Sequence, residues 1–415
     1  MKILPVIVVP ILALFATGCL GPGKWRSEIP DPAPLEFVFR DTTLSSREIE
    51  GTKQRIPEIP VRKKFRFCCA FGTGLGVKFG QLPLPFVKVG RMVNLSELGP
   101  HRYDGATAAI DDRRKNAFPK GEFNGLMYAC HGGYIDTAHV REQVDWVAYF
   151  ISQLDRHLET GAEVELPYEG GHRRLILEPV PPALIDRHGR DAVIVAVAQW
   201  LAYQGSVWHE MAQWWGWSLV TFYPEQLSGF SPEDPFSNAI GVKLLTGADV
   251  EKILSSEKEY NQSVDQLIRA ALADLRPVSN PVGERAVHAV DKIWWDSDAR
   301  LPEKAVVRRR YLDTDTELEA WLLPDKLADA ALRADLAEEC GKHPKPAVIR
   351  IPESLDGRHF SEFATLEITV TGPVGKQKVF DQIGHTITQA DFPELTEHIL
   401  EENREEFGPR AHLPD

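Results

Sequence analysis

The feature of this sequence that most constrains its fold is a long apolar segment from Asp191 to Gly216. Valine, isoleucine, alanine, leucine or tryptophan fills most of its positions, and no proline interrupts it. A helix that is apolar on all sides has to be covered on all sides, so we expect it at the centre of the folded domain. One polar stripe follows this helix at spacings of three and four residues. The stripe consists of Gln199, Tyr203, Ser206, His209, Glu210 and Gln213.

Glu210 is the member of that stripe with the strongest chemical requirement. A carboxylate buried without a partner costs several kcal/mol, so Glu210 must be protonated, paired, next to a metal ion or open to a cleft. Three interpretations therefore stay open for this residue. They are a metal-associated site, a metal-free catalytic or ligand-binding site, and a structural polar stripe in the core.

The remaining periodicity predicts an α+β protein with a mainly helical central domain and a hairpin. Further helices are expected at residues 138–157, 248–254, 263–275, 283–295 and 392–407. The hairpin is expected at residues 163–167 and 173–179, and later strands at 306–307, 347–351 and 365–371. Most of the expected helices lie before residue 300, and most of the later expected elements are strands. We therefore predict a core domain of residues 65–300 and a smaller α+β region of residues 301–415. A hydrophobic content of 43% and ten tryptophans agree with a well-packed globule.

The N-terminus has the features of a secretory signal. Lys2 precedes an apolar run from Ile3 to Ala16, which is shorter than the roughly 20 residues that a membrane-spanning helix needs. Ala16-Thr17-Gly18-Cys19 resembles the bacterial lipobox. That resemblance implies a lipoprotein: a signal peptide of residues 1–18, cleavage before Cys19, and lipid such as palmitate on the cysteine. The alternative is an ordinary signal peptide with a chance Gly-Cys pair.

Residues 19–64 are punctuated by prolines and have no sustained apolar period, which is typical of an extended tether. The residue after Cys19 is Leu20 rather than aspartate, and this resembles the sorting signal for the outer membrane. We therefore expect a protein of the cell envelope, attached to the membrane through Cys19 and facing the periplasm.

Composition and short motifs exclude some function classes. The net charge of −13, without a face rich in lysine and arginine, argues against nucleic acid as a partner. The glycine-rich run from Gly72 to Gly76 lacks a following Gly-Lys-Ser/Thr, which argues against a nucleotide site. Export permits disulfides, and the adjacent pair Cys68-Cys69 suggests one bond from that pair to Cys130 or Cys340.

The central helix contains a motif that resembles a metallopeptidase signature. His209-Glu210-Met211-Ala212-Gln213 is similar to the His-Glu-x-x-His helix of the gluzincins, of which thermolysin is the type. In that family two histidines bind zinc, and the glutamate takes a proton from the zinc-bound water. A second helix there supplies an acidic ligand and, four residues later, an aspartate behind the ligands. Asp234 and Asn238 stand at these two places here.

The motif departs from the family at three positions. Gln213 is a weak neutral ligand, Asp234 is shorter than glutamate, and Asn238 cannot carry a charge. A zinc site would therefore need another ligand, and His139 is the best candidate, because Asp136, His139 and Glu142 share one helical face. We expect His139 close to His209. The resemblance implies Glu210 as general base, His209, Asp234 and Gln213 as metal ligands, and Asn238 as a residue that supports the ligands. To these we add His139 as a ligand, and Glu233 and Asp136 as further supporting residues.

The chain as a whole also resembles a bacterial lipoprotein family that is known only as a domain of unknown function. The resemblance covers roughly residues 60 to 325 and depends on Cys68-Cys69-Ala70-Phe71-Gly72, the run from Gly132 to His139, Trp208-His209-Glu210 and the run from Pro232 to Asn238. It implies a shared fold and an envelope location, and it supplies no activity.

These observations lead to three hypotheses for the function. The first is a divergent zinc-dependent hydrolase that acts on peptide or on the peptide part of the cell wall. The second is a non-catalytic envelope lipoprotein that binds peptide or glycan. The third is a metal-free glycan hydrolase with Glu210 as the acid. The tryptophans of Trp214-Trp215-Gly216-Trp217 and Trp294-Trp295 either stack on sugar rings or belong to the core.

Overall fold

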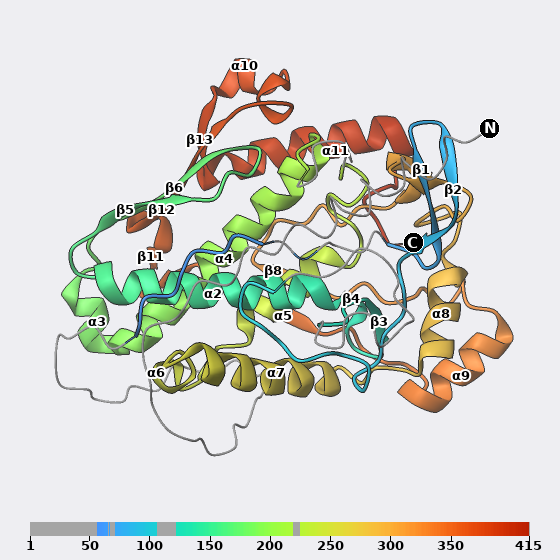
Figure 1. The fold of residues 1–415 in the computed structure, drawn as a ribbon, viewed down its shortest axis with the longest axis horizontal. Coiled ribbons are helices and arrows are strands. Elements are labelled where there is room, and N and C mark those ends of the chain that lie inside the picture. The colour runs from blue at the N-terminus through green and yellow to red at the C-terminus, as the bar shows by residue number, and fades with distance from the viewer. Residues whose placement is uncertain (1–55, 65, 67–70, 106–121, 219–224, 415) are drawn as a thin grey trace, which may run out of the picture.

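A computed structural model describes residues 56–414 with the exception of residues 65, 67–70, 106–121 and 219–224. The signal peptide, Cys19, most of the tether, and Cys68 and Cys69 lie outside the described residues. Helices and several small sheets are combined in one structure, so the predicted α+β class is confirmed (Figure 1). No helix in the described part of the chain combines the length and the apolar character that crossing a bilayer requires.

Three helices form the centre of the protein: α2 (Thr137–His157), α4 (Arg190–Trp214) and α5 (Asp234–Lys243). The long apolar segment forms α4 as expected, and its tryptophans and aliphatic residues are buried in the largest hydrophobic cluster. Gly241 allows α5 to approach α2 closely, because a Cβ atom at this position would lie 2.3 Å from the carbonyl oxygen of Val140. The packing of these helices brings together the residues of the candidate site.

An antiparallel sheet lies beside the helices in the order β13-β12-β6-β5 (Figure 1). The predicted hairpin is confirmed as β5 (Ala162–Leu166) and β6 (Gly171–Leu177). Strand β12 (Ala364–Val370) pairs with β6, and β13 (Thr386–Thr388) completes the sheet. Buried and more exposed residues alternate along β6 and β12, since one face packs on the core. The sheet thus joins strands from both sides of residue 300.

The remaining elements surround this centre. The other helices are α3 (Pro182–His188), α6 (Val250–Ile253), α7 (Glu257–Asp274), α8 (Asn280–Ala289), α9 (Ala330–Cys340), α10 (Phe380–Ile383) and α11 (Phe392–Phe407). The other strands are β1 (Leu75–Phe79), β2 (Leu82–Val89), β3 (Leu126–Ala129), β4 (Gly133–Asp136), β7 (Arg300–Leu301), β8 (Glu317–Glu319), β9 (Val348–Arg350), β10 (Ser354–Leu355) and β11 (Arg358–His359).

Three local predictions are wrong. The helix expected to reach residue 295 ends at Ala289, and Lys292 has a positive φ of 66°, which a helix cannot contain. The strand expected at 306–307 is instead a 3₁₀ turn (Lys304–Val306), followed by a single antiparallel bridge between Val307 and Trp295. The disulfide joins Cys130 to Cys340, so neither of these bonds to Cys68 or Cys69. Cys130 and Cys340 are 210 residues apart, and the spacing of cysteines in the sequence does not predict which of them pair.

A buried ion network attaches the first described segment to α2. Arg62 donates to Glu142, with Nη2 2.7 Å from Oε2, and Nη1 of Arg66 lies 2.9 Å from Oδ2 of Asp145. Arg66 also pairs with Glu122, with 2.7 Å between Nε and Oε2. All five side chains are buried. Because each charge is paired, the network holds Arg62 and Arg66 on the helix without leaving an isolated ion in the core.

Candidate metal centre

Three potential metal ligands meet at the N-terminal ends of α2 and α5. Asp136, His139 and Asp234 each offer one ligand atom, and these atoms lie within 4.8 Å of one another. The Nε2 atom of His139 is 3.1 Å from Oδ1 of Asp234. The three residues are 0%, 1% and 0% exposed, respectively. Carboxylate oxygens and imidazole nitrogens are the ligands that zinc and other divalent cations bind in proteins, so this group fits a metal ion.

Local structure explains why these residues converge. Asp136 ends β4 and caps α2, where its side chain accepts a hydrogen bond from the backbone N–H of Ala138 at 2.7 Å. Its own backbone N–H donates to the hydroxyl of Ser237 in α5 at 2.9 Å. His139 lies in the first turn of α2, and Asp234 is the first residue of α5. Two helix N-termini therefore point their partial positive charge toward the two carboxylates.

A hydrogen-bond chain orients His139 from behind. Nδ1 of His139 lies 2.9 Å from Oδ1 of Asn238, and Nδ2 of Asn238 donates to Oε1 of Glu210 at 3.3 Å. The other oxygen of Glu210 accepts from the backbone N–H of Phe230 at 2.8 Å. In a neutral His139 that donates from Nδ1 to Asn238, Nε2 is an acceptor directed at Asp234. Two facing acceptors require a proton or a cation between them, which is the arrangement of a histidine ligand held by a partner behind it.

Burial dominates the electrostatics of this centre. It raises the pKa of Asp234 to about 7, although His139 acts in the opposite direction. Burial and the nearby charge of Asp234 raise the pKa of Glu233 well above its usual range. Burial also lowers the pKa of Arg310 to about 10, against the attraction of Glu406 and of the carboxylates of the centre. The centre thus brings several carboxyl groups together where water is excluded and their charged forms are costly, and a bound cation would offset that cost.

Arg310 also supports the loop that holds Glu210. Its Nη1 atom donates to the carbonyl oxygen of Gly229 at 2.8 Å, and Phe230 follows with a positive φ of 55°. Gly229 lies against the end of α4, because a Cβ there would be 2.9 Å from the carbonyl oxygen of Glu210. This close approach directs the backbone N–H of Phe230 at the Glu210 carboxylate.

The expected proximity of His139 and His209 is confirmed, with 6.2 Å between ring centroids. The ligand atoms of His209 nevertheless lie outside the close group, and Gln213 has partners elsewhere. Nδ1 of His209 is 2.5 Å from Oε1 of Glu169, and Nε2 of Gln213 is 3.4 Å from the Glu225 carboxylate. Asp136, which the sequence suggested behind the ligands, lies among them. Glu142, on the same helical face in the sequence, pairs with Arg62 instead.

Two residues that shape the site were not predicted from the sequence. Glu169 lies in the turn between β5 and β6, and its carboxylate pairs with both His209 and Arg173. Although burial acts to raise the pKa of Glu169, the charges of Arg173 and His209 outweigh it and lower that pKa. Arg310 belongs to the run Arg308-Arg309-Arg310, in which nothing distinguishes the buried arginine from its neighbours.

The tryptophans that suggested sugar stacking belong to the core. Trp294 and Trp295 are fully buried, and Trp214, Trp215 and Trp217 are at most 6% exposed. These rings therefore offer no face to a glycan, and aromatic spacing along a helix reflects packing here.

Fold and site together define a mainly helical α+β protein with a buried candidate metal centre. Residues 56–324 match the family described as "Protein of unknown function (DUF4056)", and the chain belongs to that family. The matched segment contains Asp136, His139, Glu210 and Asp234. Searches of curated proteins and of solved structures found no match.

Proposed function

We propose that this protein is a zinc-dependent hydrolase of the cell envelope that acts on peptide bonds. The observation that carries the proposal is the buried group of Asp136, His139 and Asp234, in which Nε2 of His139 faces a carboxylate. Three protein ligands leave one position of a tetrahedral zinc open, as in catalytic zinc sites. Bound there, zinc would polarise a carbonyl group and lower the pKa of a bound water to about 7.

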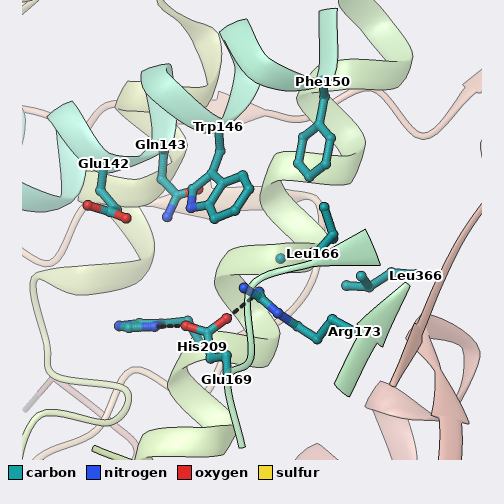
Figure 2. A pocket seen from close by; sticks show the side chains of 10 residues that line it. Glu142, Gln143, Trp146, Phe150, Leu166, Glu169, Arg173, His209 and Leu366 are labelled. Atoms are coloured by element: carbon teal, nitrogen blue, oxygen red, sulfur yellow. Dashed lines mark hydrogen bonds and ion pairs between the residues drawn. The ribbon is translucent and has the colours of Figure 1, made fainter. Parts of the chain in front are cut away.

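Other side chains suit supporting roles in such a reaction. Glu210 acts through Asn238 and fixes the orientation of His139. His209 is the better candidate for proton transfer, because it lines a cavity beside the centre and Glu169 holds its Nδ1 atom (Figure 2). Glu210 does not line that cavity, which disfavours the alternative of a metal-free glycan hydrolase with Glu210 as the acid.

The test is peptide hydrolysis by the purified protein under metal control. Chelator should abolish cleavage of blocked peptides, and zinc should restore it in the wild type but not in Asp234→Asn. Cleavage that resists both chelator and Asp234→Asn would contradict the zinc mechanism. Zinc binding without cleavage of any peptide would favour the second hypothesis, a non-catalytic protein that binds peptide or glycan.

The envelope location belongs to the same proposal. Its support is the lipobox-like Ala16-Thr17-Gly18-Cys19, together with the disulfide between Cys130 and Cys340, which is typical of exported proteins. Cys19→Ala should leave the protein without lipid and recoverable from the soluble envelope fraction. Membrane partitioning and incorporation of labelled fatty acid that persist in Cys19→Ala would contradict the lipid anchor.

A further inference from the structure

The hairpin of β1 and β2 exposes two large apolar side chains at its tip. Phe79 and Leu82 flank the turn and lie opposite each other in the register of the two strands. They are 56% and 72% exposed, more than any other large hydrophobic residue in the described part of the chain. The hairpin lies at the edge of the molecule (Figure 1). Single apolar residues are common on surfaces, but two that face each other at the end of a hairpin form a patch, and such patches mark contacts.

The tip continues an apolar face that begins in the core. Val77 and Leu84 form the next pair on the same face of the hairpin, two residues from the tip on each strand. Val77 is buried in a hydrophobic cluster, and the half-buried Leu84 packs against the same cluster. The apolar face therefore leaves the core at Val77 and ends in solvent at Phe79 and Leu82.

The opposite face of this sheet is basic. Lys88 of β2 and Arg300 of β7 both pair with Gly76 in the strand register. Side chains alternate between the two faces along a strand, so these two cations lie on the face opposite to the apolar one. Both are exposed, and neither forms an ion pair with another described residue. Lys78, on the same basic face, pairs with Glu303 at 2.7 Å.

This segment is basic in a protein that is acidic overall. The net charge is −13, but no aspartate or glutamate occurs between Glu58 and Glu97. Gly76 lies three residues before Phe79, so its register partners are about 10 Å from the tip at about 3.4 Å per residue. This order of groups fits a bilayer surface, where apolar side chains reach the acyl boundary and cations meet anionic headgroups.

We propose that the β1–β2 hairpin inserts Phe79 and Leu82 into the surface of a bilayer that contains anionic lipid. Lys88 and Arg300 then lie at the headgroups. The proposal rests on the envelope location proposed above, because lipid on Cys19 would hold the protein beside a bilayer. Residues 20–55 are long enough for the hairpin to reach that bilayer, since an extended proline-rich chain covers about 3 Å per residue.

A protein partner fits the hairpin less well than a bilayer does. Two side chains form a much smaller patch than the roughly 800 Å² that each partner buries in a stable interface. Strand β2 is an edge of its sheet, but Pro83 has no N–H to donate to an added strand. Partial insertion into a bilayer requires neither a large area nor a free strand edge, because the lipid anchor supplies the first attachment.

The test measures binding to lipid vesicles by flotation. The protein is the chain that the expected cleavage leaves, residues 19–415, produced without lipid. It should bind vesicles of phosphatidylethanolamine and phosphatidylglycerol, and it should bind neutral phosphatidylcholine vesicles less. The double variant Phe79→Asp, Leu82→Asp should bind at least about tenfold more weakly, because charged side chains do not enter the acyl region. Its melting temperature should equal that of the unchanged chain, since both side chains are exposed.

Two matched controls separate the hairpin from general surface effects. Val348→Asp changes an exposed apolar residue outside the hairpin and should bind as the unchanged chain does. Lys88→Glu should weaken binding to the anionic vesicles, whereas Lys342→Glu makes the same charge change at another exposed position and should not.

Three results would overturn the proposal. They are no binding to the anionic vesicles, binding that the double variant leaves unchanged, and a dimer in solution that the double variant dissociates, since a second copy would then cover the tip. The experiment includes neither lipid on Cys19 nor zinc. Binding that depends on the hairpin would therefore uphold the proposal even if the protein is not a zinc hydrolase. Lipid on Cys19 without such binding would leave only the envelope location standing.

Discussion

Glu210 is not among the candidate ligands, and hydrogen bonds link it to His139 through Asn238. Both of its oxygens accept hydrogen bonds, one from a side-chain amide and one from the backbone N–H of Phe230. A glutamine at this position would direct an NH2 group at one of these donors. The interaction is thus specific for a carboxylate, although Glu210 is not itself within the close group of ligands.

Glu210→Gln is therefore expected to lower the free energy of unfolding by about 1–3 kcal/mol, because one buried donor loses its acceptor. It should also weaken zinc binding by about 10–100-fold, since His139 loses its orientation. Urea unfolding and a zinc competition titration measure the two effects. Glu394→Gln, which removes an exposed carboxylate from α11, is the matched control and should change neither quantity. Unchanged zinc affinity in Glu210→Gln would show that Glu210 does not support the centre.

Glu122 gives a prediction for the pH dependence of stability. Burial acts to raise its pKa, but the charges of Arg66 and Arg141 outweigh burial and lower the pKa to about 2 from an ordinary value of 4.5. A lowered pKa stabilises the fold above pH 4.5, and that contribution is lost as pH falls from 4.5 to about 2. The shift corresponds to about 3 kcal/mol.

Glu122→Gln should thus be less stable than the wild type at pH 7, and its stability should change less between pH 4.5 and 2. Urea midpoints measured across this pH range make the comparison. Parallel pH profiles for the two proteins would indicate that Glu122 does not contribute through its charge.

At the scale of elements, the contact between α2 and α5 determines whether the ligands meet. Gly241→Ala would place a Cβ 2.3 Å from the Val140 carbonyl oxygen, so the helices must separate. We expect a loss of stability of about 1–3 kcal/mol and a loss of zinc affinity. Gly205→Ala is the matched control, because that Cβ meets no atom and alanine should stabilise α4 by about 0.5–1 kcal/mol. Equal effects of the two substitutions in thermal melts would contradict this account of the packing.

Elements with strong local periodicity could be predicted from the sequence. Helices α2 and α4 and the β5–β6 hairpin lie within a few residues of their predicted bounds, because their apolar patterns have clear periods. The end of α8 could not be predicted, since it depends on the local conformation around Lys292 and on the burial of Trp294 and Trp295.

The candidate site was predictable only in part. The motif predicted that Glu210, Asp234 and Asn238 lie in one site. In the structure Asp234 and Asn238 lie one turn apart on α5, and Asn238 donates a hydrogen bond to Glu210. Asp136 becomes a potential ligand only because α5 packs close to α2, and no local sequence pattern predicts that packing. Glu169 comes from a turn in a different part of the chain, so only the tertiary fold brings it to His209.

At the scale of the whole molecule, the disulfide between Cys130 and Cys340 links the end of β3 to the end of α9. It closes a long segment that contains both α4 and α5. Its removal should lower the free energy of unfolding by about 2–5 kcal/mol. Urea unfolding of the reduced wild type and of the Cys130→Ser, Cys340→Ser double variant should give coinciding curves below that of the oxidised protein. A wild type that is indifferent to reductant would contradict this structural role.

The metal content of the purified protein tests the central claim most directly. After exposure to zinc and removal of the excess, elemental analysis should find about one zinc per chain in the wild type and nearly none in Asp234→Asn. Asp234→Asn should remain folded in the absence of metal, and its melting temperature should be equal to or higher than that of the metal-free wild type, because a buried negative charge is gone. Asp381→Asn, at an exposed position, should keep its zinc. A wild type without zinc, or an Asp234→Asn variant that binds as much zinc as the wild type, would contradict the metal centre.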